Sequence, residues 1–93
     1  MNKAEARAIL SGELSKYRAR SYADLVSLIK KREGLETHGS SGARYQLKFD
    51  ATWDDKPNDV LRVVGAIDDG GWRAYFPLTD SFLMRPNGTF VGE

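Results

Sequence analysis

The sequence predicts an α+β domain in which two N-terminal helices pack on one face of an antiparallel meander sheet of four to five strands. Two observations carry this prediction. Apolar residues recur at helical spacing up to residue 34 and at every second position in the stretches beyond it. Short turn-forming stretches separate the alternating segments, which is typical of hairpins between neighbouring strands. We expect one domain over residues 1–93, with a helical part (1–34) and a sheet part (35–93).

The helical part divides into two segments. A first helix is expected over residues 2–18, because four apolar residues fall on one stripe: Ala6, Leu10, Leu14 and Tyr17. A second helix is expected to start after Ser21, a good N-cap, and to carry an apolar stripe as far as Ile29. The cations at 30–32 would then occupy its last turn, where they suit the helix dipole, and Gly34 would end it.

The sheet part begins with a clear strand at 44–53, whose alternate residues are apolar: Tyr45, Leu47, Phe49, Ala51 and Trp53. A polar turn at 54–59 leads to a second strand at 60–67, and the Asp-Asp-Gly-Gly stretch at 68–71 predicts a hairpin. A third strand is expected at 72–78, with Trp72, Ala74, Phe76 and Leu78 facing the helices. Strands at 81–85 and 89–91 flank the turn at 86–88, and residues 35–38 offer a further short strand.

Composition places the chain among ordinary globular proteins, with 41% hydrophobic and 29% charged residues. The absence of cysteine favours a reducing compartment, and no apolar run suits a secretion signal or a membrane span, so we expect a cytoplasmic protein. The net charge of +1 is unevenly distributed. Residues 1–48 carry ten basic and five acidic residues, whereas residues 49–93 carry four basic and eight acidic ones. The basic half can therefore face an anionic partner or complement the acidic half.

The stretch 53–93 resembles a family of small uncharacterised bacterial proteins of similar length. The resemblance rests on WDDKP at 53–57, the GAIDDGG turn at 65–71, the aromatic-Pro-Leu-Thr run at 76–79 and the closing PNGTFVGE at 86–93. It implies a bacterial fold and brings no activity, substrate or site residue with it.

The outward face of the predicted sheet is the first candidate for function. If the apolar residues face the helices, the opposite face collects four cations and an aromatic ring: Arg44, Lys48, Arg62, Arg73 and Tyr75. Cations that follow phosphates and rings that stack on bases are features of single-stranded nucleic-acid binders. Val60, Val64 and Ala66 would share this face and make it partly apolar, which suits a protein–protein contact.

Three interpretations of this face therefore stand. The leading one is a non-enzymatic interaction module that binds a protein partner or forms a homodimer through the exposed face or its last strand. The second is a single-stranded nucleic-acid binder. The third is a merely solvated face with cross-strand ion pairs such as Arg62 with Asp50.

Catalytic and cofactor motifs are weak. A metal-dependent hydrolase would need several of six aspartates to converge: Asp50, Asp54, Asp55, Asp59, Asp68 and Asp69. In a meander the 54–59 and 68–71 turns fall at opposite ends of one strand, and Asp and Gly are the residues that turns demand. His38, the only histidine, has no visible partner for base catalysis or metal binding. The glycines follow no nucleotide-binding pattern, so no cofactor is expected.

Overall fold

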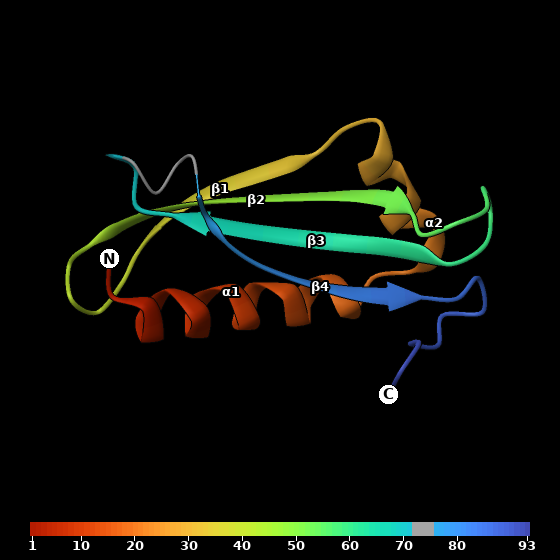
Figure 1. Ribbon diagram of the computed structural model, residues 1–93, viewed down its shortest axis with the longest axis horizontal. Helices are drawn as coiled ribbons and strands as arrows, with labels where there is room; N and C mark the ends of the chain where they lie inside the picture. Colours follow the sequence, from red (N-terminus) through yellow and green to blue (C-terminus); the bar gives the residue numbers. More distant parts are fainter. Residues whose placement is uncertain (72–75) are drawn as a thin grey trace.

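The computed structural model describes residues 1–71 and 76–93. Two helices come first, α1 (Lys3–Arg18) and α2 (Tyr22–Val26), and a single 3₁₀ turn, η1 (Ser27–Ile29), continues α2. Four strands follow: β1 (Glu33–His38), β2 (Arg44–Trp53), β3 (Leu61–Asp68) and β4 (Leu78–Met84). Figure 1 shows α1 running alongside the strands over much of their length. The predicted α+β class is confirmed.

The four strands form one sheet in the order β1-β2-β3-β4, and every neighbouring pair is antiparallel. The predicted antiparallel meander is therefore confirmed. β2 is the longest strand, and its register explains how the sheet is staggered. Glu33 at the start of β1 lies opposite Phe49, so the last residues of β2, from Asp50 to Trp53, pair with β3 alone.

The core joins buried apolar residues of the helical segments to the alternating apolar residues of the strands. α1 contacts β3 and β4, whereas α2 and η1 contact β2. The Tyr17 ring stacks on Phe49 with 4.3 Å between ring centroids. Fifteen buried hydrophobic residues make up one cluster in the described part of the chain: Ala6, Leu10, Leu14, Tyr17, Leu25, Leu28, Tyr45, Leu47, Phe49, Ala51, Leu61, Val63, Ile67, Phe82 and Met84.

The second helix is shorter than predicted. Its N-cap is Ser21, as expected, but α2 ends at Val26, η1 ends at Ile29, and the cations at 30–32 lie outside any helix. Gly34 does not end a helix, because it lies within β1 opposite Lys48. Pairing with β2 from Glu33 onward gives the backbone N–H and C=O groups of β1 hydrogen-bond partners. This tertiary pairing outweighs the local sequence preference for a helix end at 30–34. The short strand offered at 35–38 is present and starts earlier than expected.

The C-terminal strands also differ from the prediction. Thr79 and Asp80, expected to separate two strands, lie within β4 and pair with Ala66 and Gly65. Phe76, expected on the buried face, is 63% exposed, since β4 begins only after Pro77, which has no N–H to donate to a ladder. Residues 72–75 of the predicted third strand lie outside the described residues. The stretch 89–91 forms an isolated bridge, Met84 with Phe90, and no fifth strand occurs in the described ranges.

Candidate functional site

The face of the sheet turned away from the core carries the predicted face residues Arg44, Lys48 and Arg62. We call it the open face and define it by the outward residues of the four strands: Gly34, Glu36, His38, Arg44, Gln46, Lys48, Asp50, Thr52, Arg62, Val64, Ala66, Thr79, Ser81 and Leu83. The residues of β2 in this set are exposed, and those of β3 are partly covered by their neighbours. The alternation of β2 places polar residues outward at every second position, as its sequence predicts.

Three of the five predicted face residues lie on the open face. Arg44 and Lys48 are exposed on β2, and Arg62 is half-buried on β3 opposite Thr52. They do not form a cluster, because Arg44 lies near one end of the sheet and Arg62 near the other, with Lys48 between them. Arg73 and Tyr75 lie outside the described residues.

Two of these cations are engaged in ion pairs. The Arg44 guanidinium lies 3.6 Å from the Glu36 carboxylate, on the neighbouring strand. Arg62 pairs with Asp54, at the start of the turn after β2, and not with Asp50, which lies opposite Val64. Lys48 and Asp50 lie near the middle of the open face. Neither forms an ion pair within the described part of the chain. The described part of the face is thus less cationic than its sequence suggests.

On the β3–β4 half of the open face, the described residues are uncharged apart from Arg62, which is paired with Asp54, and the buried Asp68 at the end of β3. Val64, Ala66 and Leu83 are half-buried there, with the small polar residues Thr79 and Ser81 beside them. The sequence interpretation included Val64 and Ala66 but missed the contribution of β4, because it divided that strand at Thr79. The alternation of Leu78, Phe82 and Met84 was the signal that could have joined the two pieces. Val60 precedes β3 and its carbonyl accepts from the Asp54 N–H.

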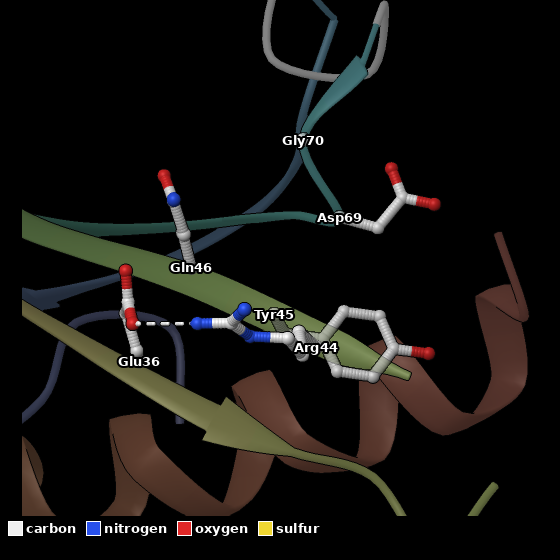
Figure 2. Close-up of a pocket in the computed structure, with 6 residues that line it drawn as sticks. All are labelled: Glu36, Arg44, Tyr45, Gln46, Asp69 and Gly70. Carbon is white, nitrogen blue, oxygen red and sulfur yellow. Dashed lines mark ion pairs between the residues drawn. The ribbon is translucent and has the colours of Figure 1, made fainter. Parts of the chain in front are cut away.

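A small polar pocket of about 180 Å³ lies at one end of the sheet (Figure 2). It is lined by Glu36, Arg44, Tyr45, Gln46, Asp69 and Gly70. Figure 2 shows Arg44 reaching toward Glu36, while Asp69 and Gly70 come from the turn after β3. Two carboxylates and one guanidinium surround a space that suits only a small polar group. The Tyr45 hydroxyl is directed to Glu5 on α1, so it is not a free reactive group.

The aspartates do not converge. Asp54 lies next to Arg62 at the start of β3, whereas Asp68 ends that strand, about 20 Å away by strand rise. The Asp68 side chain is buried and accepts a 2.8 Å hydrogen bond from the Gly70 N–H, which is a turn-stabilising contact. No group of three or more His, Asp or Glu residues within 1–71 and 76–93 is placed to hold a metal ion. His38 is exposed at the end of β1, opposite Arg44.

Two polar clusters on the helix side were missed by sequence reasoning. The Glu5 carboxylate accepts hydrogen bonds from the Ser40 and Ser41 hydroxyls, the Ser41 N–H and the Tyr45 hydroxyl. The Ser41 hydroxyl, followed by that of Tyr45, holds the pKa of the Glu5 carboxyl below its ordinary value. Glu5 therefore anchors the Gly/Ser loop between β1 and β2 to the first turn of α1. The spacing of these residues in the sequence does not predict the contact between Glu5 and the loop.

The second cluster joins the end of α1 to the start of β1. Glu33 accepts a 2.8 Å hydrogen bond from the Tyr17 hydroxyl and contacts from both terminal nitrogens of Arg20, at 2.9 and 3.1 Å. The Arg20 guanidinium lies over the Tyr17 ring, 4.2 Å from its centroid. Arg20 first, and then Tyr17, lowers the pKa of Glu33, while burial and the adjacent Glu33 raise the pKa of Tyr17. These pKa shifts belong to a structural network that holds β1 in register.

Comparisons of the chain with protein-family models, with curated proteins and with solved structures found no match. Among the described residues, no helix has the length and apolar character needed to cross a membrane. The function is therefore inferred from the chain's own geometry.

Proposed function

We propose that this chain is a small non-enzymatic interaction module whose open face binds a protein surface, with a second copy of the chain as the partner. In this proposal both helices cover the opposite face, consistent with the contacts of α1 to β3 and β4 and of α2 to β2. The observation that carries it is the group of half-buried apolar residues Val64, Ala66 and Leu83, beside which Arg62 is paired with Asp54. A surface of this mixed character, low in free charge, matches the core of a protein–protein contact.

The charges of the open face support a second copy in particular. Lys48 and Asp50 lie on the same strand, point to the same side and have no ion pair in the described part of the chain. A two-fold axis near them would place each Lys48 opposite the partner's Asp50, so that one surface complements itself. The last strand is less available for pairing, because the Val91 N–H already donates to the Leu83 carbonyl along part of its outer edge.

The alternative, single-stranded nucleic-acid binding, has less support. It requires cations that are free to follow phosphates, yet Arg44 and Arg62 are paired with carboxylates. The metal-dependent hydrolase has the least support, because it requires the aspartates of two distant turns to meet.

Sedimentation velocity over roughly a hundredfold concentration range tests the proposal, since self-association follows mass action. The native chain should sediment increasingly as a dimer as its concentration rises. Val64→Glu, which adds a charge to the centre of the open face, should remain a monomer. Ala8→Glu adds the same charge to the exposed side of α1 and should behave as the native chain does. A native chain that is monomeric throughout, or a dimer that Val64→Glu leaves intact, would overturn the proposal.

A further inference from the structure

A second surface lies on the helix side of the sheet, away from the open face. It is a shallow pocket of about 360 Å³ lined by Ala23, Val26, Ser27, Ile29, Lys30 and Trp53, which we call the Trp53 groove. The wall of the groove is mostly apolar, and only Lys30 contributes a charge. Trp53 and Val26 are half-buried, and Ile29 is 37% exposed although the helical stripe predicts it to be buried.

The stagger of the sheet explains why this apolar surface is uncovered. β1 begins opposite Phe49, so the end of β2 that carries Trp53 has no β1 residue beside it. The helical segment that approaches it ends early, as α2 stops at Val26 and a single 3₁₀ turn carries the chain to Ile29. Ile29 is consequently exposed and forms part of the groove lining.

The chain segment that leaves the groove is positively charged. Lys30, Lys31 and Arg32 are exposed on the segment that leaves the groove, and none forms an ion pair with any residue of 1–71 or 76–93. The nearest acid along the chain, Glu33, already accepts hydrogen bonds from Tyr17 and Arg20 and is also near enough to Lys31 to be affected by its charge. Exposed positive charge therefore lies on the Lys30 side of an apolar pocket, where it will attract acidic groups.

We propose that the Trp53 groove is a docking site for an acidic peptide segment of a partner protein, with one bulky apolar side chain of that segment seated against Trp53 and its acids beside Lys30–Arg32. The pocket volume lies near the lower end of the range for ligand sites, which suits one bulky side chain. An anionic membrane is the less suitable occupant, because membrane binding scales with the apolar area inserted and Ile29 is the one large apolar residue of the lining that is exposed. This site goes beyond the proposed function and does not depend on it.

The probe is a synthetic peptide with one phenylalanine flanked by glutamates, and the matched probe replaces the glutamates with lysines. Binding is followed by tryptophan fluorescence in a Trp72→Phe background, where Trp53 is the one tryptophan left. The acidic peptide should change the Trp53 emission, and its affinity should fall as salt is added. The lysine peptide should not bind.

Two variants test whether the peptide binds in the Trp53 groove. Trp53 itself is left unchanged, because it also packs against the core. Ile29→Ser should weaken binding through the apolar wall, and Lys30→Glu should weaken it by roughly tenfold through the reversed charge. Lys3→Glu, an equal charge change at the start of α1, should have no effect. Val64→Glu should also bind the peptide normally, which separates this site from the open face.

Three outcomes would overturn the proposal. The first is no change in Trp53 emission with the acidic peptide. The second is binding that Ile29→Ser and Lys30→Glu leave unaffected. The third is binding to phosphatidylserine vesicles through these residues while the peptide fails to bind, which would assign the groove to a membrane surface.

Discussion

The hydroxyl of Tyr45 donates a 2.8 Å hydrogen bond to the carboxylate of Glu5, forty positions earlier in the chain. The same carboxylate holds the loop that joins β1 to β2, through Ser40 and Ser41. One side chain of α1 therefore connects the helix, the hairpin loop and the second strand. Gly39 completes the contact, because a Cβ at that position would lie 1.9 Å from a Glu5 oxygen.

Glu5→Gln should loosen this loop. The amide keeps the shape of the side chain but loses the charge that strengthens each accepted hydrogen bond. We expect a lower melting temperature and faster amide hydrogen exchange at residues 39–43, with exchange in β3 unchanged. Glu13→Gln, on the same helix, is the matched control. Equal exchange of the loop in the native chain and in Glu5→Gln would show that Glu5 does not anchor it.

Acid should weaken the fold through Glu33. Its pKa is lowered in the folded chain by Arg20 and then by Tyr17, below the ordinary value of 4.5. Such a carboxyl stabilises the fold above its ordinary pKa, and that stabilisation is lost as the pH falls through the lower, folded value. Glu33→Gln should therefore unfold more easily than the native chain at neutral pH and lose less stability on acidification. Urea unfolding across this pH range measures both. Parallel pH profiles for the two chains would contradict the network.

Two glycines offer opposite outcomes for the same substitution. A Cβ at Gly65 would lie 2.9 Å from Leu10 Cδ1 and 2.9 Å from Phe49 Cε1, so Gly65→Ala should destabilise the core by about 1–3 kcal/mol. Gly12 lies within α1 with no atom in reach of a new Cβ, so Gly12→Ala should stabilise the helix by about 0.5–1 kcal/mol. Thermal unfolding of both variants tests how closely α1 packs on β3. A stabilised Gly65→Ala would mean that this packing is looser than described.

Nucleic-acid binding through the open face should be absent. With Arg44 and Arg62 paired, Lys48 is the one predicted face cation within 1–71 and 76–93 left to offer its charge to a phosphate. Labelled single-stranded oligonucleotides are titrated at low salt with the native chain and with Lys48→Ala. The native chain should show no binding beyond that of Lys48→Ala. Binding whose affinity falls steeply with salt, and which Lys48→Ala and Arg62→Ala both weaken, would instead support the nucleic-acid alternative.

The strands with one buried face were the most predictable part of this fold. The alternation over 44–53 and the apolar positions 61, 63 and 67 correspond to buried residues of β2 and β3. Successive side chains of a strand point to opposite faces, so burying one face fixes which residues point inward. The end of the second helix was not predictable from its neighbours in the chain. The cations at 30–32 and Gly34 are typical of a helix terminus, yet pairing of Glu33 with Phe49 decided where β1 starts.

The candidate site was predictable only in outline. Alternation placed Arg44, Lys48 and Arg62 on the outward face, but their ion pairs depend on the register between strands and on the course of the 54–59 turn. The interpretation of a merely solvated face gave Arg62 with Asp50 as an example of a cross-strand pair, whereas the register places Val64 opposite Asp50. The Trp53 groove was not foreseen at all, since it results from the stagger between β1 and β2.

In our proposal the open face binds a second copy of the chain. The most direct test is a series of two-dimensional ¹H–¹⁵N spectra recorded as the protein is diluted, because each amide reports its own surroundings. We predict concentration-dependent shifts at Lys48, Asp50, Val64, Ala66 and Leu83, with the amides of α1 unmoved. Spectra that do not change with concentration, or shifts confined to the helices or to the outer edge of β1, would contradict it.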